Sequence, residues 1–98
     1  MTTRERRRVV IRGLVQGVGF REKVRRIALQ HDVAGFVRNV GHDAVEIDVE
    51  GDPQVLDAFV EEVRARPPRH ARVDEFTCTT LAPQGARGFV VAPSVGEE

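Results

Sequence analysis

The chain has 98 residues, which is the size of one small domain. Hydrophobic residues make up 41% of the sequence, enough for a modest core, which argues against a disordered chain. The 15 basic and 15 acidic residues cancel, so the net charge gives no argument for a nucleic-acid or membrane partner.

The first part of the chain predicts a strand, a loop and a helix. Residues Arg7–Arg12 contain a short run of β-branched residues and predict a strand. The glycines within Gly13–Gly19 predict a loop. From Phe20 the apolar residues recur at helical spacing, which predicts an amphipathic helix of about three turns, ending near residues 31–32.

Two strands joined by a turn come next. Gly35–Val40 predicts a second strand, Gly41–Asp43 a turn, and the alternating stretch Ala44–Glu50 a third strand. One face of this third strand is apolar and predicted to pack on helices, while the other is predicted to meet water. That second face carries Glu46, Asp48 and Glu50.

A second helix and two strands complete the pattern. Asp52 is the predicted N-cap, Pro53 the first helical residue, and the proline pair at 67–68 ends the helix. Arg72–Leu81 predicts a fourth strand and Gly88–Ala92 a short fifth one.

This order, β-α-β-β-α-β with an extra strand, predicts the α+β class. With right-handed crossovers it gives a two-layer ferredoxin-like sandwich, with a mixed or antiparallel sheet and two helices on one face. We expect one domain over residues 7–92, a flexible basic N-terminal end over residues 1–6 and a loose C-terminal tail over residues 93–98.

The Gly13–Arg21 loop lies between a strand and a helix N-terminus, where backbone N–H groups are unpaired and the helix dipole is positive. Glycines let successive N–H groups converge on one anion, and the planar guanidinium of Arg21 matches two phosphate oxygens. The loop therefore predicts a site for a tetrahedral anion, with a tight turn that binds nothing as the alternative. The sequence has neither the Lys-Ser/Thr of a P-loop nor the third glycine of a dinucleotide fingerprint.

These residues carry a resemblance to a known family. Val15–Arg21, followed by Gly35–Asn39, resembles the double signature of the acylphosphatase family, and the likeness extends from about Arg7 to Val91. The family has the same βαββαβ fold. It hydrolyses the carboxyl–phosphate bond of acyl phosphates to a carboxylate and inorganic phosphate, without metal or cofactor.

The resemblance implies roles for particular residues. Arg21 and Asn39 would be catalytic, with Asn39 orienting the attacking water. The phosphoryl group would be bound by Val15, Gln16, Gly17, Val18, Gly19, Phe20 and Arg21. The family commonly has Asp-Gly in the turn after the asparagine, whereas Val40–Ala44 here contains Gly-His-Asp, so we expect a turn of different shape.

The C-terminal half narrows the resemblance and leaves alternatives open. Pro67–Asp74 and Gly88–Ser94 resemble the N-terminal acylphosphatase-like domain of the hydrogenase-maturation carbamoyltransferase, which consumes carbamoyl phosphate. Three functions remain: an acylphosphatase, a domain acting on carbamoyl phosphate, and a silent module that binds a phosphorylated metabolite. We expect a monomer whose partners are a small acyl phosphate and inorganic phosphate, the latter as product and inhibitor.

Other function classes are disfavoured. The first strand lacks the aromatic residues that RNA-recognition domains stack on bases, and the carboxylates of the third strand would repel a phosphate backbone. His31, His42 and His70 are dispersed without metal-ligand spacing, so no metal site is expected.

The lone Cys78 excludes an internal disulfide and predicts an inert, partly buried thiol. No apolar stretch approaches the roughly 20 residues of a membrane helix, and no signal-peptide pattern precedes the first strand. We therefore expect a cytoplasmic protein with no membrane partner.

Overall fold

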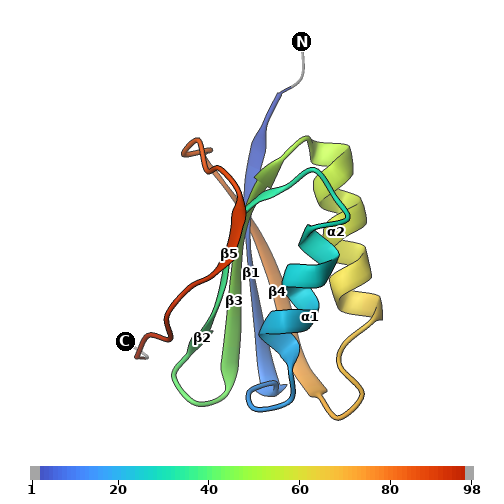
Figure 1. Ribbon diagram of the computed structural model, residues 1–98, viewed down its shortest axis with the longest axis vertical. Helices are drawn as coiled ribbons and strands as arrows, with labels where there is room; N and C mark the ends of the chain where they lie inside the picture. The colour runs from blue at the N-terminus through green and yellow to red at the C-terminus, as the bar shows by residue number, and fades with distance from the viewer. Residues whose placement is uncertain (1–2, 97–98) are drawn as a thin grey trace.

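A computed structural model of the chain describes residues 3–96, with elements in the order β1-α1-β2-β3-α2-β4-β5 (Figure 1). The strands are β1 (Glu5–Leu14), β2 (Ala34–Val40), β3 (Ala44–Gly51), β4 (Arg72–Leu81) and β5 (Phe89–Val91). The helices are α1 (Phe20–Ala28) and α2 (Pro53–Ala65). The predicted element order is confirmed, and β4 has the predicted bounds.

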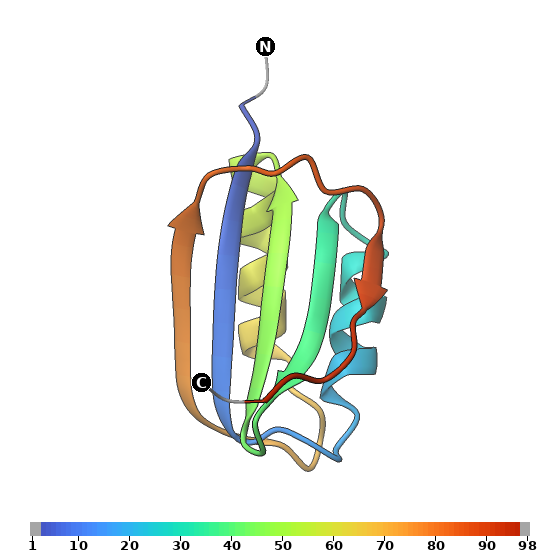
Figure 2. The ribbon, with the colours of Figure 1, turned by 90° about the vertical axis from the view of Figure 1, so that its left-hand side faces the viewer.

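The strands form one five-stranded sheet in the order β4-β1-β3-β2-β5. Neighbouring strands are antiparallel, except that β2 and β5 run parallel. Both helices cover one face of the sheet (Figure 1), and Figure 2 views the sheet from the face that they leave open. The predicted two-layer α+β sandwich with a mixed sheet is therefore confirmed.

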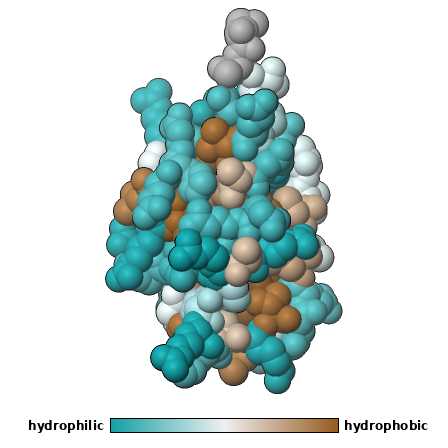
Figure 3. Space-filling model, turned by 90° about the vertical axis from the view of Figure 1, so that its right-hand side faces the viewer, coloured by the Kyte–Doolittle hydropathy of each residue, from teal (hydrophilic) through white to brown (hydrophobic). Residues whose placement is uncertain are grey.

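The hydrophobic core lies between the helix layer and the sheet. Full burial of an aliphatic or Phe side chain stabilises a fold by about 1.5–3 kcal/mol, so this cluster holds the two layers together. Hydrophilic residues dominate the outer surface of the helix layer (Figure 3), as expected for amphipathic helices. Nearly fully buried core residues include Val9, Ile11, Val24, Ile47, Val49, Leu56 and Phe59.

The prediction that the acidic face of β3 meets water is wrong for Asp48. This residue is only 4% exposed. The guanidinium of Arg6 on β1 donates two hydrogen bonds to its carboxylate, Nε to Oδ1 at 2.8 Å and Nη2 to Oδ2 at 2.7 Å. Because the antiparallel register places arginines of β1 beside β3, cations replace the water that the alternation alone would predict.

The same correction applies to Glu50, which is 1% exposed. Its carboxylate accepts hydrogen bonds from the backbone N–H groups of Gln84 at 3.1 Å, Gly85 at 3.0 Å and Ala86 at 3.3 Å. The third acidic residue, Glu46, is half-buried and pairs with Arg38 at 2.8 Å. Residues distant in sequence therefore cover Asp48 and Glu50, whereas Glu46 is paired with a residue of the neighbouring strand β2.

Two local predictions also differ from the structure. Helix α1 ends at Ala28, earlier than predicted. The hydrogen bonding there changes to the tighter i→i−3 pattern, with Gln30 N–H donating to the Ile27 carbonyl at 3.0 Å. The Cys78 thiol is exposed rather than partly buried, because β4 is an outer strand of the sheet. Asp52 does occupy the N-cap position of α2, but its side chain makes no capping hydrogen bond.

Ordered structure extends into both segments expected to be loose. Strand β1 begins at Glu5, and Arg6 is already paired with Asp48. Beyond β5, Val95 forms a parallel bridge with Val40. Residues 1–2 and 97–98 of the expected tails lie outside the described residues.

Candidate active site

Two glycines shape the loop between β1 and α1. Gly17 has φ of +73° and Gly19 of +83°, a conformation that L side chains rarely adopt. Gly19 is the N-cap of α1, and its carbonyl accepts a hydrogen bond from Lys23 N–H at 3.0 Å. Among residues 3–96, no acceptor pairs with the backbone N–H groups of residues 16–19. This arrangement of unpaired donors at the positive end of a helix suits a tetrahedral anion.

A hollow of about 290 Å³ lies beside this loop. It brings together residues from the loop, the first turn of α1 and two strands that are far apart in the sequence. The hollow is lined by Val15, Gly17, Gly19, Phe20, Arg21, Glu22, Asn39 and Val91. The structure therefore brings both predicted catalytic residues, Arg21 and Asn39, to one cavity with most of the predicted loop.

Arg21 is half-buried in the first turn of α1. Its guanidinium makes no hydrogen bond or ion pair with any other residue of the described chain. A planar cation with unused donors at the mouth of a small cavity can bind two oxygens of one anion.

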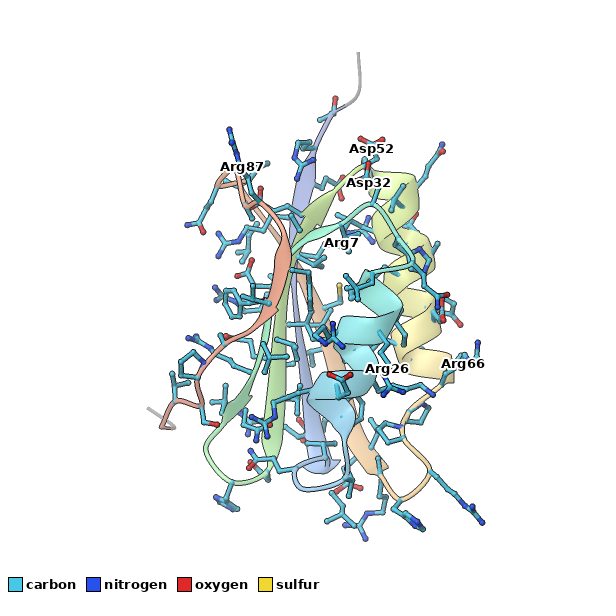
Figure 4. All side chains as sticks on the ribbon, in the orientation of Figure 1. Arg7, Arg26, Asp32, Asp52, Arg66 and Arg87 are labelled. Atoms are coloured by element: carbon cyan, nitrogen blue, oxygen red, sulfur yellow. The ribbon has the colours of Figure 1, made fainter. Side chains whose placement is uncertain are left out.

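The neighbouring Glu22 does not neutralise Arg21. Its carboxylate accepts hydrogen bonds from Arg25 at 2.8 Å and from Arg26 at 3.0 Å, and Figure 4 labels Arg26 on α1. The hydrogen bonds from Arg25 and then Arg26 lower the pKa of Glu22 to about 2. Because these two cations hold the carboxylate, Arg21 remains available to an anion in the cavity.

Asn39 lies near the end of β2 and is 9% exposed. Its side-chain oxygen Oδ1 is buried and has no hydrogen-bond partner among the described residues. An unpaired buried acceptor is costly, and such groups usually bind water or ligand. The structure therefore leaves an acceptor for a water molecule in the same cavity as Arg21.

Gln16 and Val18, which were predicted to bind phosphate, do not line the cavity. The side chain of Gln16 points to the β2–β3 turn, where Nε2 donates to the carbonyls of Val40, Gly41 and Ala44. Val18 packs partly buried against the core. These two residues can therefore reach an anion in the cavity only through their backbone N–H groups.

The sequence did not reveal that Val91 and Glu22 line the cavity. Val91 is there because β5 pairs in parallel with β2, with Val37 opposite Val91. No pattern within either strand's own sequence indicates that β5 pairs with β2. Glu22 is the residue after Arg21 in the first turn of α1, so the helix prediction alone could have placed it beside the cavity.

The histidines take no part in this cavity; His31, for example, pairs with Glu62 at 2.9 Å. Within residues 3–96, no group of three or more His, Cys, Asp or Glu side chains could hold a metal ion. The same part of the chain has no helix long and apolar enough to cross a membrane.

Comparison with known proteins identifies the family. The family model described as Acylphosphatase matches residues 7–91. An acylphosphatase from Synechococcus sp. (strain RCC307) is 42% identical over 90 residues, covering 92% of this chain and 76% of the relative. The crystal structure of acylphosphatase from Bacillus subtilis superposes with a TM-score of 0.84 at 32% identity, covering 90% of this chain and 98% of that one.

Larger proteins contain a similar unit. Full-length HypF, crystallised in a phosphate- and nucleotide-bound form, matches 98% of this chain with a TM-score of 0.93 at 30% identity. Carbamoyltransferase HypF2 from Cupriavidus necator is 42% identical over 88 residues, or 89% of this chain. The chain spans only 13% and 11% of these two proteins, respectively. The family model over residues 7–91, together with the 42% identity to an acylphosphatase, shows that the chain belongs to the acylphosphatase family, whose members are hydrolases acting on acyl phosphates.

Proposed function

We propose that this chain hydrolyses the carboxyl–phosphate bond of an acyl phosphate, with the phosphoryl group held by Arg21 and the loop amides of residues 15–20. Asn39 orients the attacking water. The observation that carries this proposal is that an unpaired guanidinium and an unpaired buried amide oxygen line the same cavity.

The reaction needs little more than these groups. The water oxygen forms a bond to phosphorus while the bond from phosphorus to the acyl oxygen breaks, and the carboxylate leaves with that electron pair. Charge on the phosphoryl oxygens is stabilised by Arg21 and the loop N–H groups. The water donates a hydrogen bond to Asn39 Oδ1, and because an amide oxygen is a weak base, the proton passes to the phosphate product. Inorganic phosphate then occupies the same site and inhibits the enzyme.

The direct test is hydrolysis of benzoyl phosphate in the presence of EDTA. The unaltered chain should release benzoate and phosphate, with competitive inhibition by inorganic phosphate. Arg21→Ala should lose turnover and phosphate binding together, whereas Asn39→Ala should lose turnover and still bind phosphate. No turnover above a buffer blank would exclude the enzyme and favour a silent binding module.

Carbamoyl phosphate is the second candidate substrate. The observation that favours it is the similarity to HypF, which superposes on 98% of this chain with a TM-score of 0.93. The same anion site would hold its phosphoryl group, while the small carbamoyl group would leave the outer part of the cavity unfilled. The ratio of kcat/KM for carbamoyl phosphate to kcat/KM for benzoyl phosphate distinguishes the two candidate functions. A higher value for carbamoyl phosphate would assign this chain the carbamoyl-phosphate role.

A further inference from the structure

The segment that follows β5 is hydrogen-bonded along β2 as far as Val95. Ala92 N–H donates to the Val37 carbonyl at 2.9 Å, so the segment leaves β5 still attached to β2. Figure 2 shows this stretch continuing past the arrowhead of β5 and crossing the lower end of the sheet. Residues 92–96, which we call the C-terminal strap, therefore reach the end of β2 that carries Asn39.

Val95 contacts the backbone on both sides of Val40. Its N–H donates to the carbonyl of Asn39 at 3.0 Å, and its carbonyl accepts from Gly41 N–H at 2.9 Å. The ladder between β2 and β5 covers only Gly35–Val37 of β2. On this edge of β2, the strap is thus what holds the backbone of Asn39.

The sequence of the turn gives a reason for such a clamp. The stretch from Gly41 to Asp43 lacks the Asp-Gly pair that would favour a tight hairpin turn by itself. Hydrogen bonds from outside the turn help to fix its shape instead. Val95 contributes two backbone hydrogen bonds, the Gln16 side chain donates to the Gly41 carbonyl, and Gly13 N–H donates to the Asp43 carbonyl at 3.0 Å. We propose that the Val95 backbone is a positioning element that sets the direction of the Asn39 side chain in the cavity.

This inference rests on the proposed hydrolytic role of Asn39. The strap adds little to the core, because Val95 is 37% exposed and its neighbours Ser94 and Gly96 are exposed. Its removal should therefore change the placement of Asn39 more than the stability of the fold. A misplacement of about 1 Å at a reacting group can cost about 100-fold in rate.

The test compares Val95→Pro with Val95→Ala, using benzoyl phosphate. Both variants lose the valine side chain, but only proline removes the N–H that binds the Asn39 carbonyl. Val95→Pro should lower kcat by about 10-fold or more, while KM and the inhibition constant of inorganic phosphate stay within about two-fold. Val95→Ala should restore most of the turnover, and the two variants should unfold at similar temperatures.

A pair of shortened chains keeps the test independent of any strain that proline introduces at Ser94. A chain ending at Gly96 retains Val95 and should keep its kcat, whereas a chain ending at Pro93 should lose kcat as Val95→Pro does. Equal kcat for the two shortened chains would overturn the positioning role, as would a parallel loss of phosphate affinity in Val95→Pro. If the unaltered chain has no turnover, the proposed function fails instead, so the two failures are distinguishable.

Discussion

The side-chain nitrogen Nε2 of Gln16 donates a 2.9 Å hydrogen bond to the carbonyl oxygen of Ala44, and so joins the loop between β1 and α1 to the first residue of β3. The same nitrogen lies 3.1 Å from the Gly41 carbonyl and 3.3 Å from that of Val40. The loop that would hold the phosphoryl group and the strand end that carries Asn39 are therefore connected by one amide.

Replacing Gln16 by Glu should break this connection. A carboxylate cannot donate a hydrogen bond, and its charge would face three carbonyl oxygens, so we expect a loss of about 1–3 kcal/mol in the free energy of unfolding. Turnover of benzoyl phosphate should fall too, because the loop and Asn39 would no longer be held together. Gln16→Ala removes the donor without adding charge and should be less damaging. Equal urea unfolding curves for the Glu and Ala variants would contradict the expected repulsion.

Arg21→Lys should show that geometry as well as charge matters at this position. Lysine keeps the positive charge but loses the planar fork that can bind two phosphoryl oxygens. We expect kcat/KM for benzoyl phosphate to fall by about 100-fold, the size measured for other single charge-stabilising donors. Arg66→Lys, at the exposed end of α2 and outside the cavity, is the matched control and should have the activity of the unaltered chain. Equal activities for the two lysine variants would mean that the fork is not used.

Glu50→Gln should destabilise the fold without altering the active site. The buried carboxylate accepts three backbone N–H groups from the β4–β5 connection, and an amide would present its own donors to some of them. Hydrogen bonds to a charged group contribute about 1.5–3 kcal/mol, so a loss of about 2 kcal/mol in unfolding free energy is expected. Glu61→Gln, on the exposed side of α2, should leave stability unchanged. Thermal unfolding of both variants checks this, and similar midpoints would show that Glu50 is not a structural anchor.

Asp48 should make stability depend on pH in acid. Burial raises the pKa of its carboxyl, but the hydrogen bonds and charges of Arg6 and Arg8 outweigh burial and hold the pKa below the ordinary 3.8. A carboxyl with a depressed pKa in the folded state stabilises the fold above its unfolded pKa, and this stabilisation is lost as the pH falls through the folded value.

The measurement compares unfolding free energies of the unaltered chain and Asp48→Asn between pH 6 and pH 2. The unaltered chain should be more stable at pH 6, and its advantage should shrink as the pH falls below about 4. Glu22, whose pKa is also lowered, is present in both proteins, so the difference isolates Asp48. An advantage that does not change with pH would mean that the charge of Asp48 adds nothing to folding.

The chain's local patterns were sufficient for the order of elements and for the core of the site. The glycines and Arg21 lie within nine consecutive residues between a strand and a helix, so their chemistry is encoded by short-range geometry. Asn39 could be placed only through the family resemblance, because an asparagine near a strand end is by itself an ordinary turn residue.

The sequence by itself determined which residues are apolar on each face, where the chain turns and where an anion could bind. Only the tertiary structure decided that Asp48 and Glu50 are buried, that Val91 lines the cavity and that Val95 holds the backbone of Asn39. The reason is physical. Alternation along a strand shows to which face a side chain points, whereas the exposure of that side chain depends on what packs against it. Here the residues that pack against Asp48, Glu50 and Asn39 come from strands and loops more than 30 residues away in the chain.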